Sequence, residues 1–194
     1  FAGLVLSLGA CIMDWNTGKH YLNEMMIVDN YSIAFTALMI CVTLIWFVLS
    51  PDFFRDQTAR VDHFALIIFA LTGAMLLTSF GNMIMLFLAV EILSIPMYVL
   101  AGSHKKNLSS NEAALKYFLM GAFATGFLLF GIALIYGQTG SFNLQQISSA
   151  MAAEQGGSVL VVTGVLLILV GLFFKVSAAP FHFWAPDVYT GAPT

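Results

Sequence analysis

The chain alternates between long apolar runs and short polar stretches. Four runs are nearly uncharged and long enough for membrane-spanning helices, at residues 31–49, 63–80, 83–101 and 112–136. A hydrocarbon core about 30 Å thick needs about 20 residues of α-helix to cross it. The pattern therefore predicts a transmembrane helix over each of these ranges.

Two further apolar runs depart from this pattern. Residues 1–13 are too few to cross a bilayer and predict a partial helix. Residues 158–192 begin with an uncharged stretch and continue past Lys175 and Pro180 into aromatic residues. Proline lacks an N–H group and its ring clashes with the preceding helical turn. We therefore expect this last span to be broken near 177–180.

Together these elements predict an all-α integral membrane protein. The expected fold is a polytopic helix bundle with a discontinuous transmembrane helix, forming a single transmembrane domain over residues 1–194. The chain opens without methionine inside one apolar run and stops soon after another. We therefore expect it to be a piece of a longer, multi-pass membrane protein.

Composition narrows the function classes. Hydrophobic residues make up 60% of the chain and charged residues 9%, whereas a soluble domain usually carries about a quarter charged residues. Cytosolic enzymes and disordered segments are thereby excluded. The seven Lys and Arg residues form no basic run, so nucleic acid is not an expected partner. The expected partner of this apolar chain is the lipid bilayer.

No redox or metal centre is predicted in this chain. Cys11 and Cys41 lie singly in apolar runs, which argues against a disulfide or a thiolate metal site. The sequence contains no glycine-rich phosphate loop, no cysteine cluster for iron–sulfur and no spaced histidine pair for haem. We therefore expect no catalytic residue, cofactor or metal ligand here.

Glu91 is the clearest candidate for a functional residue in this chain. It lies nine residues after Asn82 in an apolar helix, and at 1.5 Å per residue it sits roughly 13 Å deep. A charge in a transmembrane helix costs about 2.5–3.5 kcal/mol on insertion scales, so such residues mostly mark ion or proton routes. A structural ion pair that locks two helices is the alternative. Pro96, five residues later, is expected to bend or break this helix beside the carboxylate.

Lys175 and His182 flank the predicted break at Pro180. If the span ended at Lys175, the residue would be an ordinary lysine that extends toward the interface. The apolar residues beyond it favour a lysine inside the membrane, where burial allows proton exchange near physiological pH. His182 is either a proton relay or a polar residue satisfied among aromatic neighbours.

The role of Lys116 has two possible interpretations from the sequence. Ser109 and Glu112 have the spacing of a helix capping box, and Glu112 and Lys116 have the favoured i, i+4 spacing of an ion pair. The residue is therefore either part of an interfacial ion pair or a proton-transfer group. Farther along, Gly121 and Thr125 are four residues apart, as are Ala122 and Gly126, which indicates a face for close helix packing.

Three stretches of sequence carry a family resemblance. They are Leu88–Tyr98 (LAVEILSIPMY), Glu112–Phe123 (EAALKYFLMGAF) and Phe174–Pro193 (FKVSAAPFHFWAPDVYTGAP). They resemble the antiporter-like membrane subunits of respiratory NADH:quinone oxidoreductase, the complex I family, and most closely the subunit N group. The resemblance covers the whole chain but only about the N-terminal half of a family member.

The resemblance implies a fold, a set of residues and a function. The implied fold is the family's five-helix unit with a discontinuous helix. Glu91 matches the glutamate that pairs with a lysine on the broken helix, Lys175 matches that lysine, and Lys116 matches a lysine one helix earlier. Such subunits translocate protons while NADH, FMN, iron–sulfur clusters and quinone carry electrons in partner subunits. A place in the bacterial plasma membrane among other membrane subunits is implied.

Two rival functions stay open. A subunit of a multi-subunit cation/proton antiporter or a membrane-bound hydrogenase shares the Glu and Lys pattern. A structural membrane scaffold would use the same buried charges only to hold helices together. We expect a proton-translocating subunit of an NADH:quinone oxidoreductase, part of an enzyme that holds its redox site elsewhere.

Overall fold

The computed structural model describes residues 1–50, 57–153 and 158–193, and the side chains of residues 57–60 are outside the description. The chain divides into two compact units, Phe1–Met97 and the residues from Tyr98 onward. The boundary between them falls inside one helix.

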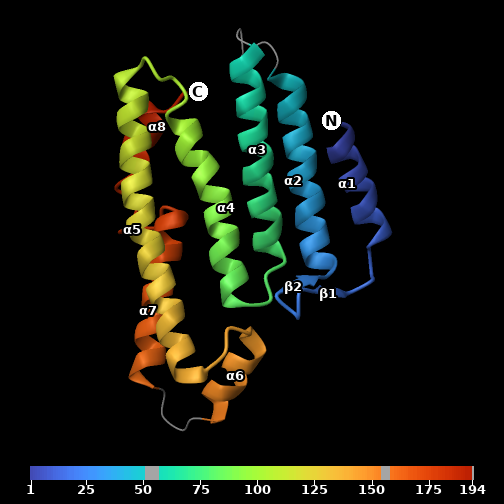
Figure 1. Cartoon of the computed structure of the whole chain (residues 1–194), viewed down its shortest axis with the longest axis vertical. Helices are drawn as coiled ribbons and strands as arrows, with labels where there is room; N and C mark the ends of the chain where they lie inside the picture. The colour runs from blue at the N-terminus through green and yellow to red at the C-terminus, as the bar shows by residue number, and fades with distance from the viewer. Residues whose placement is uncertain (51–56, 154–157, 194) are drawn as a thin grey trace. The chain divides into compact units, whose positions relative to one another are not determined.

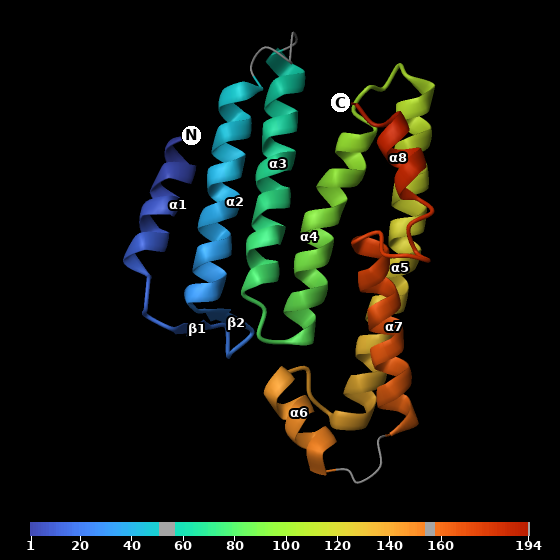
Figure 2. The ribbon, with the colours of Figure 1, turned by 180° about the vertical axis from the view of Figure 1, so that it is seen from behind.

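The first unit consists of helices and one small hairpin (Figure 1). Its elements are α1 (Ala2–Met13), β1 (Lys19–Tyr21), β2 (Met26–Val28), α2 (Asn30–Leu49), α3 (Gln57–Thr78) and α4 (Met83–Ala101), the last of which continues into the second unit. Helices α1, α2 and α3 lie side by side, with the hairpin at one end of α1 and α2 (Figure 2). The apolar runs at 1–13, 31–49 and 83–101 thus correspond to α1, α2 and α4, and α3 begins six residues before the predicted 63.

The hairpin was not predicted from the sequence. Strands β1 and β2 are antiparallel, with Lys19 opposite Val28. The Ile27 N–H donates to the Ser79 carbonyl at 2.7 Å, which joins β2 to the turn after α3. The following helix begins where the Asp29 side chain accepts a hydrogen bond from the Ser32 N–H at 2.8 Å. The polar stretch between α1 and α2 therefore forms a cap at one end of this unit.

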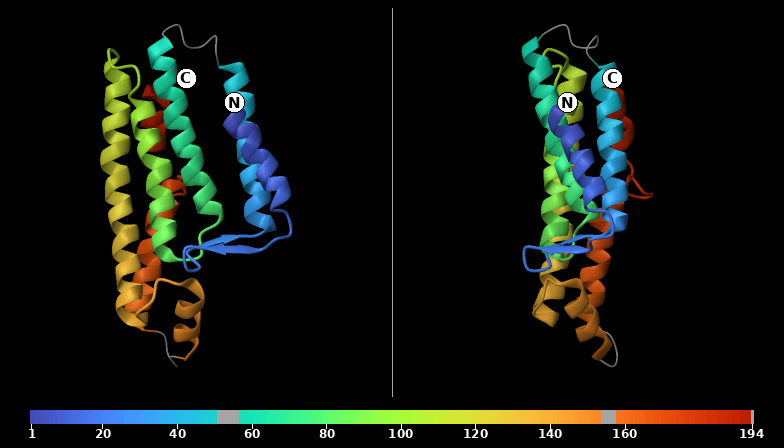
Figure 3. Two further views of the ribbon diagram at one scale, coloured as in Figure 1. Left: turned by 45° about the vertical axis from the view of Figure 1, so that its right-hand side comes forward. Right: turned by 90° about the vertical axis from the view of Figure 1, so that its right-hand side faces the viewer.

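The second unit is built on two long helices that pack closely. Its elements after α4 are α5 (Leu108–Thr139), α6 (Leu144–Ala153), α7 (Val159–Lys175) and α8 (Ala185–Gly191). Helix α7 runs along α5, as Figure 3 shows from two sides. Glycines at the contact let the two backbones approach, because a β-carbon on Gly131 would lie 2.5 Å from the Gly164 carbonyl oxygen. Leu128 and Ile132 are buried beside this contact.

Two local expectations were wrong. Helix α4 continues through Pro96 to Ala101, so this proline does not break it, and the expected bend stays a prediction. A single proline removes only one backbone hydrogen bond, and the turns on either side keep theirs. Helix α5 begins at Leu108, where the Asn107 side chain accepts a hydrogen bond from the Ser109 N–H at 3.0 Å. Asn107 is therefore the N-cap, and Ser109 lies inside the helix.

The helices have the length and surface of membrane-spanning segments. Four of them, over Asn30–Leu49, Val61–Thr78, Met83–Ala101 and Leu108–Thr139, are long and apolar enough to cross a bilayer within the described residues. Large apolar side chains such as Val42, Phe123 and Phe130 are more than half exposed. Exposed apolar surface of this extent needs a nonpolar surrounding. The predicted all-α, multi-pass membrane fold is confirmed.

Candidate functional site

The candidate site lies at the C-terminal end of α7. The helix ends at Lys175, and Ser177 follows with a φ of 54°, in the left-handed region. The Ser177 N–H donates to the Phe174 carbonyl at 3.1 Å, and the Ala178 N–H donates to the Phe173 carbonyl at 2.9 Å. This pair of bonds is a Schellman motif, which satisfies carbonyls at a helix end. Lys175 is therefore the last residue of a properly terminated helix.

The interruption extends from Val176 to Trp184, and α8 begins at Ala185. Pro180 lies inside it, and the Ala179–Pro180 peptide bond is cis. The predicted discontinuous helix is confirmed. The helix ends at Lys175, five residues before Pro180, because the left-handed Ser177 already turns the chain. The proline then prevents the helix from resuming at once, since it has no N–H to donate.

Lys175 is held by a tyrosine. Its ammonium nitrogen Nζ donates to the Tyr98 hydroxyl at 2.9 Å, and it lies 5.5 Å from the centre of the Tyr98 ring. Tyr98 is 6% exposed and Lys175 is half-buried. The alternative of a lysine that extends toward the interface expects an ammonium directed away from the protein. Here the ammonium is directed at a buried hydroxyl.

Aromatic rings connect Tyr98 to the interruption. The Tyr98 ring meets the Tyr117 ring edge to face at 4.6 Å, and Tyr117 stacks on Trp184 at 4.6 Å with an angle of 6°. Trp184 stacks in turn on Phe174 and donates from Nε1 to the Phe174 carbonyl at 3.1 Å. Offset and edge-to-face rings contribute beyond their buried area. The aromatic column therefore fixes both Tyr98 and the non-helical segment after Lys175.

The small-residue face predicted on α5 lies against Tyr98. A β-carbon on Gly121 would lie 2.7 Å from the Tyr98 ring carbon that carries the hydroxyl. Thr125, one turn later, is buried, and its hydroxyl donates to the Gly121 carbonyl at 2.9 Å. Gly126, on another face, would meet nothing within 4 Å. The Gly121 part of the predicted small-residue face thus accepts the tyrosine, whereas the Gly126 part makes no such contact within the described residues.

Lys116 forms ion pairs on two sides. Its ammonium lies 2.8 Å from the Glu112 carboxylate, as the i, i+4 spacing predicts, and 2.7 Å from the Asp187 carboxylate on α8. All three side chains are 40–65% exposed in this structure. The second pair ties α8 to α5. Sequence reasoning missed Asp187, since no local spacing links it to Lys116.

The proton-transfer roles expected of Glu91 and His182 are not tested by the structure. Glu91 is half-buried in α4 and belongs to the first unit, whereas Lys175 belongs to the second. Their mutual approach stays a prediction. The His182 side chain is exposed, and its carbonyl accepts a hydrogen bond from the Ala185 N–H at 3.0 Å at the start of α8. The pairing of Glu91 with Lys175 and the proton relay at His182 therefore both stay predictions.

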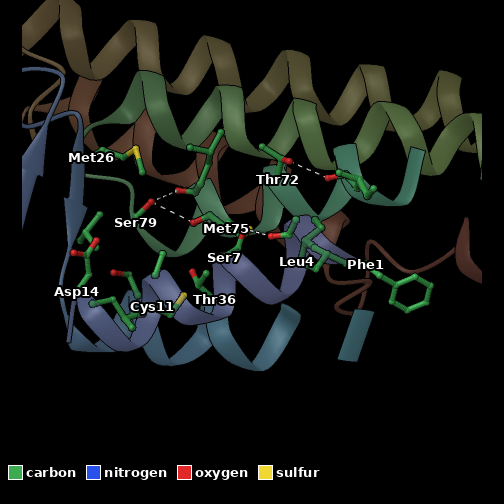
Figure 4. A pocket seen from close by; sticks show the side chains of 18 residues that line it. Phe1, Leu4, Ser7, Cys11, Asp14, Met26, Thr36, Thr72, Met75 and Ser79 are labelled. Atoms are coloured by element: carbon green, nitrogen blue, oxygen red, sulfur yellow. Dashed lines mark hydrogen bonds between the residues drawn. The ribbon is translucent and has the colours of Figure 1, made fainter. Parts of the chain in front are cut away.

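The first unit also contains an apolar cavity of about 720 Å³ between α1, α2 and α3 (Figure 4). Asp14 lies at one end of it and Phe1 at the other, with hydroxyls such as Thr72 along the wall. None of the sequence-predicted site residues is among those that line it. Among the described residues, no three His, Cys, Asp or Glu side chains are grouped to hold a metal ion.

Residues 80–194 match the family model for the transmembrane segment of "NADH:quinone oxidoreductase/Mrp antiporter". The chain is 50% identical to NADH-quinone oxidoreductase subunit N of Cytophaga hutchinsonii, over 98% of this chain and 40% of that protein. A chain in respiratory complex I from Thermus thermophilus with bound aureothin is 38% identical, with a TM-score of 0.80 over 99% of this chain and 41% of that one. A chain of the Mrp complex from a Dietzia species is similar in fold, with a TM-score of 0.77 and 20% identity over 98% and 38% of the two chains. The chain thus spans about two fifths of the length of the curated relatives it matches.

Proposed function

Since this chain belongs to the transmembrane family shared by NADH:quinone oxidoreductases and Mrp antiporters, we propose that it translocates protons as a membrane subunit of an NADH:quinone oxidoreductase. The proposed location is the bacterial inner membrane, among other membrane subunits of the same complex. Relatives at 45–50% identity carry the name of that oxidoreductase's subunit N, which supports the assignment.

One observation carries the proposal. Lys175 ends a helix that is interrupted in an apolar run, and its ammonium is bonded to a buried hydroxyl. A residue that relays protons has to change its charge inside the membrane. A lysine can do so because desolvation favours its neutral form, whereas a nearby opposite charge favours its ammonium form. Broken helices supply the backbone groups and the space that such a route needs.

Glu91 is proposed as the charge that controls Lys175. Two charges at membrane depth are tolerated mainly as partners, or when one neutralises the other by proton transfer. We therefore expect the two side chains to approach each other or to share a water bridge in the assembled protein. Charged atoms well beyond about 10 Å apart, with no water between them, would contradict this coupling.

Lys116 and His182 are proposed as further proton-transfer residues. Lys116 contacts two carboxylates, so its alternative role is to tie α8 to α5. The variant Lys116→Arg separates these roles, because arginine keeps both ion pairs but does not release its proton. Loss of pumping in an assembled Lys116→Arg complex supports a transfer role, and retained pumping supports a tie.

The complex's electron transfer is proposed to take place elsewhere. NADH, FMN, iron–sulfur clusters and quinone are assigned to partner subunits, and this chain's part is to bind and move protons. The family also includes Mrp antiporters, so a subunit of a cation/proton antiporter is the second candidate. Purification separates the two, because flavin and iron–sulfur absorbance should accompany only the redox complex.

The test is proton uptake by vesicles that contain the assembled complex, measured after addition of NADH and quinone and expressed per NADH oxidised. Lys175→Met removes the titrating group and should abolish pumping while the complex still assembles. Lys175→Arg keeps the charge but should also fail. Lys105→Met is the matched control, because Lys105 is exposed in the turn between α4 and α5.

A structural scaffold predicts the opposite pattern. Arginine would preserve a structural charge contact, so full pumping by Lys175→Arg would reject the relay. The scaffold also predicts that Glu91→Gln lowers stability and leaves transport intact. The relay instead predicts that Glu91→Gln lowers the protons pumped per NADH in complexes that assemble normally.

A further inference from the structure

The hydroxyl of Tyr98 is the contact of Lys175 that neither the sequence motifs nor the family match assigns a role. It accepts a hydrogen bond from Lys175 Nζ at 2.9 Å and belongs to a side chain that is 6% exposed. A buried hydroxyl next to a titrating amine acts on the amine's charge directly.

The surroundings of Tyr98 fix the hydroxyl in place. Gly121 faces it from α5, and any side chain there would overlap the phenol oxygen and the ring carbon beside it. The Tyr117 ring meets the Tyr98 ring edge to face, and Phe118 approaches it at 5.9 Å. The ring can therefore neither swing toward α5 nor rotate away freely. Gly121 provides the space in which the hydroxyl reaches Lys175.

A phenol suits both charge states of a lysine. Its oxygen accepts a hydrogen bond from an ammonium, and its O–H donates to the lone pair of a neutral amine. A phenylalanine in the same place does neither. The bond to the ammonium is the stronger of the two, since hydrogen bonds to charged groups are about twice as strong as neutral ones.

We propose that Tyr98, seated against Gly121, is a positioning residue that keeps the Lys175 amine hydrogen-bonded in both protonation states and favours the charged one. This inference rests on the proposed function of Lys175 as a proton carrier. Tyr98 keeps its own proton throughout. The proton that Lys175 releases passes to the next carrier.

The first experiment compares Tyr98→Phe with Tyr117→Phe in the assembled complex. Both substitutions keep an aromatic ring in the same column, but only the first removes the hydroxyl that Lys175 contacts. The hydroxyl stabilises the ammonium more than it stabilises the neutral amine, and the difference between the two hydrogen bonds changes the ratio of charged to neutral lysine by roughly tenfold. We expect Tyr98→Phe to lower pumping per NADH about tenfold at neutral pH. We expect its pumping to decline at a pH about one unit lower than in the unsubstituted complex.

The second experiment reaches the same hydroxyl from the other helix. Gly121→Ala should displace the Tyr98 hydroxyl and reproduce the shifted pH profile, whereas Gly126→Ala, where a β-carbon meets nothing within 4 Å, should not. The pH profile is the decisive measurement, because a substitution that only loosens packing lowers assembly without moving that profile.

The outcomes distinguish this inference from the function on which it rests. If Lys175→Met pumps normally, the proton-carrier function itself is rejected. If Lys175→Met abolishes pumping but Tyr98→Phe keeps the normal rate and pH profile, the role of Tyr98 is rejected and that of Lys175 stands. A shift in both Tyr98→Phe and Gly121→Ala, and in neither control, supports the proposal.

Discussion

The close contact between α5 and α7 makes a quantitative prediction at Gly131. An alanine β-carbon there would lie 2.5 Å from the Gly164 carbonyl oxygen and 2.9 Å from the Ile168 backbone nitrogen. Non-bonded heavy atoms usually settle about 3.5–4.0 Å apart, so α7 would have to move by about 1 Å. Both opposing atoms belong to the backbone of a helix, which cannot yield locally as a side chain can.

The expected cost follows from overpacking. Extra methyl groups in well-packed contacts typically cost 1–3 kcal/mol. Replacement of glycine by alanine in a helix also brings a gain of up to about 1 kcal/mol from helix propensity. Gly137→Ala, in the same helix, isolates that gain, because a β-carbon there meets nothing within 4 Å. The difference between the two variants should therefore be about 1–3 kcal/mol, with Gly131→Ala the less stable.

The measurement is the free energy of unfolding of the full-length protein in mild detergent, from titration with a denaturing detergent followed by circular dichroism. Equal stability of Gly131→Ala and Gly137→Ala would refute the close approach of α5 and α7. A larger loss for Gly137→Ala would show that the exposed and the packed faces of α5 have been interchanged.

Three further predictions concern the ends of helices. Trp184→Phe keeps the stacked rings but removes one of the two N–H groups that donate to the Phe174 carbonyl at the end of α7, so it should lower the free energy of unfolding by about 1 kcal/mol in the same titration. Asp187→Asn should lower the thermal midpoint slightly at low ionic strength and negligibly at high salt, because its pair with Lys116 is exposed. A hydrogen bond to Asp14 raises the pKa of Lys19 above its usual 10.5. The contribution of the Lys19 ammonium is therefore present below pH 10.5 and lost as the pH rises further, and amide exchange in the hairpin should show this loss on the alkaline side.

Helix positions could be predicted because membrane burial imposes a simple rule on composition. Each long apolar run had to satisfy its backbone internally, and only a helix does so within one segment. The discontinuous helix was predictable from Pro180. The hairpin was not, because β1 and β2 have only three residues each and one side of β2 bonds to the turn after α3. A contact with a turn far along the chain cannot be recognised from the local pattern of apolar and polar residues.

The candidate site was predictable in its charges but not in its neutral partners. Lys175 is conspicuous because a charge in an apolar run is costly, whereas Tyr98 looks like any aromatic residue near a helix end. A usable signal existed, since Tyr98 follows Glu91 by seven residues, or about two helical turns, and therefore lies on the same face of its helix. Asp187 left no such signal, because its pairing with Lys116 depends on how the chain returns after the interruption.

From the unequal lengths of α5 and α7 we expect the protein to be sensitive to the thickness of the surrounding bilayer. Helix α5 has 32 residues, about 48 Å at 1.5 Å per residue, so even a tilt of 40° leaves it longer than a hydrocarbon core of about 30 Å. Its polar ends can stay in water in thin and thick bilayers alike. Helix α7 has 17 residues, about 26 Å, and falls short of that core. Longer acyl chains should therefore create hydrophobic mismatch at α7 first, and the terminus that carries Lys175 is where the thickness of the bilayer should affect the proton transfer that we propose for this residue.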